Sequence, residues 1–271
     1  MPLACDEIEL TFLGTGTSHG VPMIACDCAV CRSDDPRDRR NRASVAIRTP
    51  DRRVILIDTA PELRLSAVAR GIERADAILF THAHADHIMG LDDVRRFNDV
   101  LGGALTCYGT PETLRRLRDV FDYAMKPFPA AGADRPSLVL EPIDAASEIC
   151  GVRVIPVPLR HGNAEILGFR IGQLAYCTDC SAIPAGSWDL LAGLDLLVLG
   201  ALRHRPHPAH FNLAEALDVI RRLRPRRALL THVTHELPHA ATNAGLPTGV
   251  NLAYDGLAVR APLGKNLHPL P

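Results

Sequence analysis

From residue 77 to residue 87 the chain reads Ala77-Ile78-Leu79-Phe80-Thr81-His82-Ala83-His84-Ala85-Asp86-His87. The first five residues have the length and apolar composition of a buried strand, so they predict a strand over 77–81. Three histidines and a carboxylate then follow within six positions, which brings four metal-ligating side chains to one edge of a sheet. Imidazole nitrogens and a carboxylate oxygen are donors that hold zinc or a similar divalent ion. The pattern predicts a site for one ion or for two. One ion rarely needs four donors from one short loop, so the ligands can be shared between two ions.

Other apolar runs also end in residues of ligand type, namely Asp58, His161, Asp179 and His232. Each of these residues follows a predicted strand. Rigid strands aim the side chains at their ends, and active sites gather at such sheet edges. The sequence therefore predicts that these residues join residues 82–87 in one metal centre.

Bulk composition narrows the class of protein. The chain has 271 residues, 47% of them hydrophobic, which is enough to bury a sizeable core. Its formal net charge of -1 provides no general attraction to nucleic acid or to an anionic membrane. No apolar stretch has the length of a membrane span, and the first residues lack a secretory pattern. We therefore expect a cytoplasmic protein without a membrane partner, with one domain over 1–271 and a loose tail over 262–271.

Short apolar strands alternate with amphipathic helices along the whole chain. Strands are expected at 8–13, 44–48, 54–57, 77–81, 105–108, 152–156, 166–171, 174–177, 196–199, 228–231, 250–254 and 257–259. Helices are expected at 61–70, 111–121 and 213–223, the last with Asn212 as its cap. This order predicts an α/β (α+β) fold in which two sheets pack face to face with helices outside.

Taken in chain order, the motifs resemble those of the metallo-β-lactamase superfamily. The matching residues are Ile57-Asp58, Thr81 to His87, His161, Thr178-Asp179 and Thr231-His232. The resemblance covers nearly the whole chain and implies an αββα four-layer sandwich with a two-metal site at one edge. It implies that one ion is held by His82, His84 and His161, and the other by Asp86, His87 and His232, with Asp179 bridging. Asp58 would orient the ligands from behind.

Two neighbouring divalent ions would lower the pKa of a shared water from about 16 toward 7. The resulting bridging hydroxide could attack a phosphorus or carbonyl carbon, and Asp86 is predicted to take part in catalysis. Asp86 and Asp179 are hard oxygen ligands, so manganese or iron can compete with zinc. The sequence does not choose among these metals.

A second metal site is predicted from Cys26, Cys28 and Cys31, three cysteines within six residues. Such spacing outside a secreted protein indicates structural zinc, which needs a fourth ligand, and His235 is the candidate. The preceding segment, residues 12–22, together with this cysteine pattern is similar to the PhnP-type phosphodiesterases. The resemblance implies a structural zinc held by the three cysteines and His235.

His210 stands two residues before Asn212-Leu213. This setting is similar to that of a histidine that assists the leaving group in PhnP-type enzymes. The expected function is therefore metal-dependent hydrolysis of a phosphodiester in a small molecule, a cyclic ribose phosphate or a nucleotide. One alternative is a transfer-RNA 3′-processing endoribonuclease, which the near-neutral charge disfavours along with any nucleic-acid partner. Others are a thioester hydrolase and a non-catalytic metal- or nucleotide-binding protein. A homodimer is left open.

Overall fold

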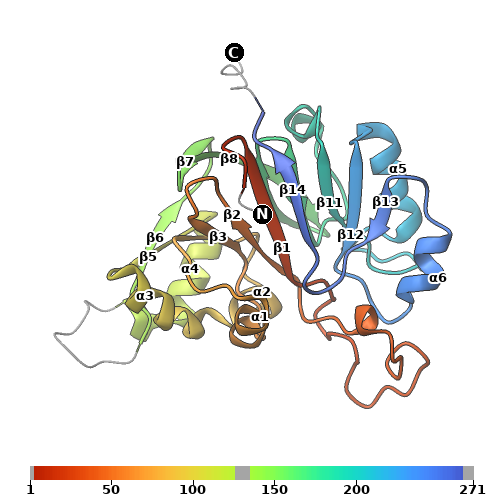
Figure 1. The fold of residues 1–271 in the computed structure, drawn as a ribbon, viewed down its shortest axis with the longest axis horizontal. Helices are drawn as coiled ribbons and strands as arrows, with labels where there is room; N and C mark the ends of the chain where they lie inside the picture. Colours follow the sequence, from red (N-terminus) through yellow and green to blue (C-terminus); the bar gives the residue numbers. More distant parts are fainter. Residues whose placement is uncertain (1–2, 126–134, 265–271) are drawn as a thin grey trace.

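The computed structural model describes residues 3–125 and 135–264 and consists of two seven-stranded sheets (Figure 1). The first sheet has the order β14-β1-β2-β3-β4-β5-β6 and the second has the order β13-β12-β11-β10-β9-β8-β7. The strands of the first sheet are β1 (Glu7–Gly14), β2 (Ser44–Arg48), β3 (Val54–Ile57), β4 (Ala77–Leu79), β5 (Leu105–Gly109), β6 (Leu138–Pro142) and β14 (Ala258–Pro262). Those of the second are β7 (Ser147–Ile149), β8 (Val152–His161), β9 (Ala164–Ile171), β10 (Leu174–Cys177), β11 (Leu196–Gly200), β12 (Arg227–Thr231) and β13 (Val250–Leu252).

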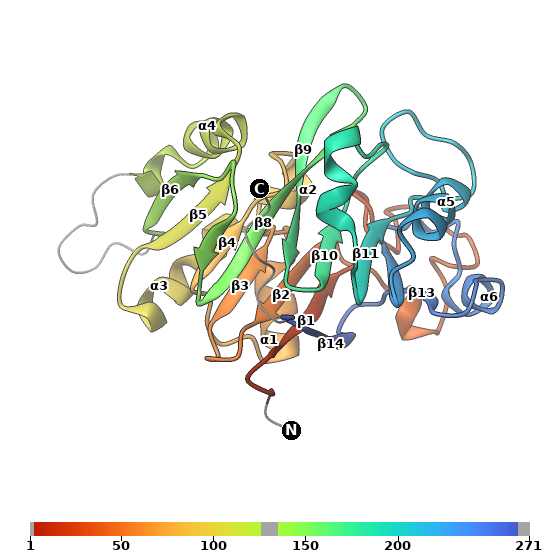
Figure 2. The same ribbon diagram turned by 90° about the horizontal axis from the view of Figure 1, so that it is seen from above.

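Three apolar layers hold the molecule together. The inner faces of the two sheets share one core, in which Leu10 and Phe12 of β1 join Phe169 and Ile171 of β9. The outer face of the first sheet packs under α1 (Leu63–Arg70), α3 (Arg95–Leu101) and α4 (Pro111–Val120). The outer face of the second packs under α5 (Leu213–Leu223) and α6 (His239–Ala244) (Figure 2). The expected αββα four-layer sandwich is thus confirmed.

Local sequence explains the clearest helix. The Asn212 side chain accepts a hydrogen bond from the Glu215 amide, and the Glu215 carboxylate accepts one from the Asn212 amide. This capping box starts α5 where the sequence predicted. The first helix starts at Leu63, two residues later than expected. Within the described residues, no helix combines the length and apolar character that a bilayer crossing needs.

Several predictions about elements were wrong. β6, β7, α2, α3 and α6 were not predicted, and the strand at 77 was predicted to run through Thr81 although β4 ends at Leu79. The Thr81 amide donates to the carboxylate of Asp58 and not to a neighbouring strand. The other strands were located, with ends that differ by up to five residues; β8 runs to His161.

The tail was also predicted incorrectly in its first part. Pro262 belongs to β14 and its carbonyl accepts from the Gln173 amide, while the Leu263 amide donates to the Asp6 carbonyl at 2.7 Å. Backbone pairing therefore holds the chain as far as Leu263. Residues 265–271 lie outside the described part.

Parallel pairing fixes where the site lies. In the first sheet β3, β4 and β5 run parallel, and in the second β10, β11 and β12 do so. Carboxyl ends of parallel strands share one edge, which is where ligand sites of open α/β sheets form.

Candidate metal centre

Strand ends deliver the predicted ligands to one place. Asp58 follows β3 directly, and Asp179 and His232 come just after β10 and β12. All three have positive φ, at 61°, 56° and 56°. Residues other than glycine rarely adopt this left-handed conformation, and such strain concentrates at functional sites. Each strand thus ends in a sharp turn that redirects a polar side chain.

The structure brings all seven predicted histidine and aspartate ligands together in two adjoining groups. One group is His82, His84 and His161, and the other is Asp86, His87, Asp179 and His232. Within each group the candidate ligand atoms lie within 4.8 Å of one another. Asp179 Oδ1 lies 3.0 Å from His232 Nε2, and Asp179 Oδ2 lies 3.3 Å from His87 Nε2.

Asp179 also falls in a third group, with His161 and His210. It therefore lies between the two sets, where a bridging ligand would have to be.

The unpaired nitrogens of this centre fit metal ions. His82 Nε2, His87 Nε2 and both ring nitrogens of His232 are buried and have no hydrogen-bond partner of good geometry in the described residues. Two of these nitrogens, His87 Nε2 and His232 Nε2, lie beside Asp179 but do not form a well-aligned hydrogen bond with it. Several such nitrogens beside two carboxylates are the donor set of a transition-metal site, so the residues present fit divalent metal ions.

A hydrogen-bond network fixes how the imidazoles face. Fully buried Asp58 accepts from His87 Nδ1 at 2.7 Å, and from the amide and hydroxyl of Thr81 at 2.8 Å each. His161 Nδ1 donates to the Ala209 carbonyl at 2.7 Å. Since one nitrogen of each ring is occupied, the other, Nε2, is turned toward the centre as a ligand. Asp58 thus lies behind His87 and is hydrogen-bonded to its ring.

The carboxylates of the centre favour the protonated form of the neighbouring histidines. Burial opposes a charge on His232, but Asp179 and Asp86 outweigh it and raise the pKa of His232 to about 9. Burial would raise the pKa of Asp179, but His232 and His87 hold it well below its usual value. Without metal, protons on these histidines therefore compensate the carboxylates. A divalent ion would replace those protons, as metal binding generally does.

His210 is partly exposed and lies against the histidines of this centre. Its ring stacks on His232 with centroids 4.9 Å apart and meets His161 edge-on at 4.6 Å. Burial, followed by the neighbouring charge of His232, lowers the pKa of His210 to about 3. A neutral imidazole still donates one N–H, so His210 can hydrogen-bond an oxygen of a bound substrate.

The second predicted metal site also assembles. Nδ1 of His235 lies 3.2, 3.4 and 3.5 Å from the sulfurs of Cys26, Cys28 and Cys31. The Cys31 amide donates to the Cys28 sulfur, and the Met23 amide donates to the Cys31 sulfur. Three sulfurs and one imidazole nitrogen around one point are the ligands of a closed tetrahedral zinc site.

Sequence reasoning missed the threonines that precede the ligands. Thr81 bonds both Asp58 and His82, and the hydroxyl of Thr178 donates to Asp179 Oδ2 at 2.7 Å. The repeated Thr-His and Thr-Asp pairs at strand ends were the available signal. Their role became clear only once the partners were placed.

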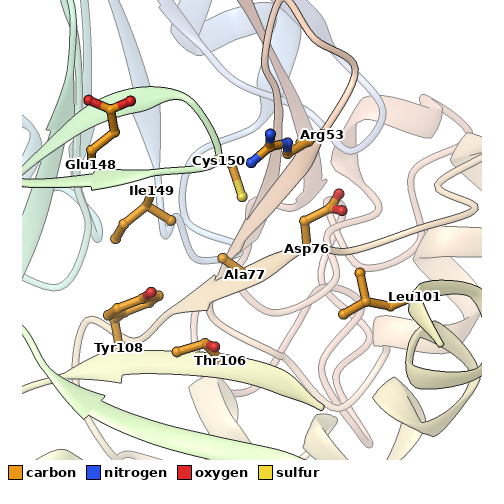
Figure 3. A pocket seen from close by; sticks show the side chains of 9 residues that line it. All are labelled: Arg53, Asp76, Ala77, Leu101, Thr106, Tyr108, Glu148, Ile149 and Cys150. Atoms are coloured by element: carbon orange, nitrogen blue, oxygen red, sulfur yellow. The ribbon is translucent and has the colours of Figure 1, made fainter. Parts of the chain in front are cut away.

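A cavity of about 370 Å³ lies away from the metal centre, beside Ala77 at the start of β4 (Figure 3). Arg53, Asp76, Tyr108 and Cys150 are among its lining residues. None of the predicted site residues lines it. The centre at the opposite end of β4 therefore remains the candidate functional site.

Comparison with known proteins agrees with this geometry. The family model of the beta-lactamase superfamily domain matches residues 53–233, and the chain belongs to this family. The resemblance seen in the sequence is thereby confirmed, and membership supports a metal-dependent hydrolase. In structure, the chain is similar to a diphosphatase described as new in the PhnP family. The TM-score is 0.87 with 45% identity, over 94% of this chain and 97% of the other.

Curated relatives carry other names. A Porphyromonas gingivalis protein named octanoyltransferase is 36% identical over 90% of this chain, and the chain spans only 50% of its length. A ribonuclease Z from Mycobacterium sp. (strain KMS) is 30% identical, over 72% of this chain and 66% of the relative. The first name describes a protein about twice as long and does not fit the site found here.

Proposed function

We propose that this chain is a binuclear metal-dependent phosphodiesterase that acts on a small molecule, a cyclic ribose phosphate or a nucleotide. The observation that carries the proposal is the pair of adjoining ligand groups that meet at Asp179. Two divalent ions, when bound there, would provide a nucleophile at neutral pH and neutralise the charge on a phosphoryl group. Manganese, zinc or iron suits the mixed nitrogen and oxygen donors.

The residues of the chain would divide the remaining work. Asp179 and Asp86 place negative charge between the histidines and hold the ligand groups together. His210, which lies beside His161 and Asp179, would donate a hydrogen bond to the leaving oxygen or to a non-bridging oxygen. The Cys26–His235 zinc site would fix the loop that also carries His232. Asp58 and Thr81 would keep the imidazoles aimed.

A second candidate is hydrolysis of a diphosphate linkage, a phosphoanhydride in which each substituted phosphorus carries one ester oxygen and one bridging anhydride oxygen. The PhnP-family neighbour described as a diphosphatase favours it, because the likeness extends over nearly the whole of both chains. Ribonuclease Z relatives keep transfer-RNA processing as a competing outcome, although the net charge of -1 offers little general attraction to RNA.

The test is hydrolysis of bis(p-nitrophenyl) phosphate by manganese-loaded protein. We expect turnover that falls by more than about 100-fold in Asp179→Ala, because loss of a metal ligand costs more than loss of an outer partner. The exposed Asp189→Ala is the matched control and should keep full activity. A cyclic nucleotide, a dinucleoside diphosphate, precursor transfer RNA and a thioester are then compared. Cleavage of the thioester alone would contradict the proposal, and cleavage of RNA alone would favour the endonuclease.

A further inference from the structure

Arg40 is the largest fully buried side chain of the described residues, with 1% of its surface exposed. Its guanidinium donates to the Thr234 and Leu237 carbonyls at 2.7 Å each and to Asp38 Oδ1 at 3.1 Å. Asp38 in turn accepts from the His239 amide at 2.8 Å. One buried guanidinium is thus hydrogen-bonded to the backbone on both sides of His235.

The segment to which Arg40 is hydrogen-bonded, residues 232–237, supplies a candidate ligand to each metal site. His232 belongs to the binuclear group and His235 to the cysteine group, and the two residues are three positions apart. A shift of this short segment would therefore misplace one ligand in each site at once.

The backbone of Arg40 reaches the other half of the cysteine site. Its amide donates to the Val21 carbonyl at 2.7 Å, and its carbonyl accepts from the Val21 amide at 2.8 Å. Val21 leads directly into the loop that carries Cys26, Cys28 and Cys31. Arg40 therefore ties the cysteine loop to the segment that supplies the histidine.

Charge supports the same role. Burial lowers the pKa of Arg40, and the nearby acidic groups, first Asp38 and then Asp255, oppose that effect. A zinc ion with three thiolates and a neutral imidazole would carry one net negative charge. A buried guanidinium near Cys31 compensates that charge where water cannot.

We propose that Arg40 is a positioning residue that holds residues 232–237 so that His232 and His235 reach their two metal sites together. The inference rests on the proposed metal-dependent function. It concerns metal binding and not the reaction, so a protein that bound its ions but cleaved no phosphodiester would leave it intact.

The chain offers a closely matched control in Arg170. This arginine is 6% exposed and donates to three backbone carbonyls, those of Gly172, Leu190 and Ala192, at 2.7 to 2.9 Å. None of these residues is a candidate ligand or lies within two positions of one. Arg170→Met therefore removes a similar clamp and a similar buried charge away from the metal sites.

The experiment measures metal affinity by chelator competition, with zinc for the cysteine site and manganese for the binuclear site. Outer partners of ligands typically change affinity by 10–100-fold, and we expect at least about 10-fold weaker binding at both sites in Arg40→Met. Arg170→Met should bind as the wild type does, even if its unfolding midpoint falls. Arg40→Lys, which keeps the charge with fewer donors, should be intermediate.

Unchanged affinity at either site in Arg40→Met would overturn the proposal, and so would an equal loss in Arg170→Met. If Arg40→Met does not fold, Arg40→Lys is judged by the same comparison, with at least about threefold weaker binding expected at both sites and unchanged affinity counting against the proposal.

Discussion

Asp58 accepts hydrogen bonds from two residues of the 81–87 segment while it is fully shielded from water. A carboxylate in such a place is stable only because three donors meet it. Its place after a predicted strand indicated that Asp58 would join the centre, and the resemblance to the superfamily implied its orienting role. The threonine and arginine partners could not be predicted in this way, because their contacts come from segments far apart in the chain. Arg40 and Leu237, for example, are separated by 197 positions.

We expect Asp58→Asn to weaken metal binding about 10- to 100-fold, because an amide cannot accept from all three donors and His87 would turn. Asp195→Asn is the matched control, since Asp195 is also buried but pairs with Arg226 and Arg227. Chelator competition with manganese measures both. Equal affinities for wild type and Asp58→Asn would contradict the orienting role.

At the cysteine site, Cys28→Ser should lose one zinc per chain while the ions of the binuclear centre stay bound. A serine hydroxyl is a far poorer zinc ligand than a thiolate. Elemental analysis by mass spectrometry counts the metals. Full retention of zinc would refute the site.

At the scale of elements, α2 (Ala85–Ile88) carries Asp86 and His87 on a single turn. Gly90, just beyond it, lies so close to Ala60 that an added Cβ would overlap the Ala60 carbonyl oxygen. The Gly90 amide donates to the Thr59 carbonyl, next to Asp58. The ligand turn is therefore seated against the end of β3 through a contact that only glycine permits.

Gly90→Ala should cost about 2 kcal/mol or more in the free energy of unfolding, because the backbone must move apart. In Gly186→Ala an added Cβ meets nothing within 4 Å, so the change should stay within about 0.5 kcal/mol. Urea unfolding of both variants gives the comparison. Similar urea midpoints for Gly90→Ala and Gly186→Ala would contradict a contact that only glycine permits.

The helices and strands differ in how well they could be predicted from the sequence. Buried β3 and capped α5 were predicted residue by residue, because continuous apolar runs and helical caps are strong local signals. The edge strand β6 and the short β7 were missed. All five residues of β6 are half-buried or exposed, and its apolar run is only three residues long, so its pairing with β5 decides its structure.

At the scale of the whole molecule, Asp255 joins distant parts of the chain. It accepts from the Thr15 hydroxyl and the Asn41 amide at 2.7 Å each. Burial raises the pKa of Asp255 to about 6. The sandwich itself was predictable from the order of the motifs, but hydrogen bonds between residues so far apart in the chain were not.

Asp255 gives the stability of the fold a definite pH dependence. A carboxyl has a pKa near 3.9 when unfolded, so between about pH 4 and pH 6 the folded state holds more protons. The contribution of Asp255 therefore falls as pH rises through this window, by up to about 3 kcal/mol. Urea unfolding at several pH values should show a steeper fall for wild type than for Asp255→Asn. Parallel curves would contradict the raised pKa.

Anomalous X-ray scattering from crystals loaded with manganese and zinc would locate each bound metal directly. We expect two metal peaks on either side of Asp179, one near His82, His84 and His161 and one near Asp86, His87 and His232. We expect a separate zinc peak among Cys26, Cys28, Cys31 and His235. A single peak beside Asp179, or none, would contradict a binuclear centre.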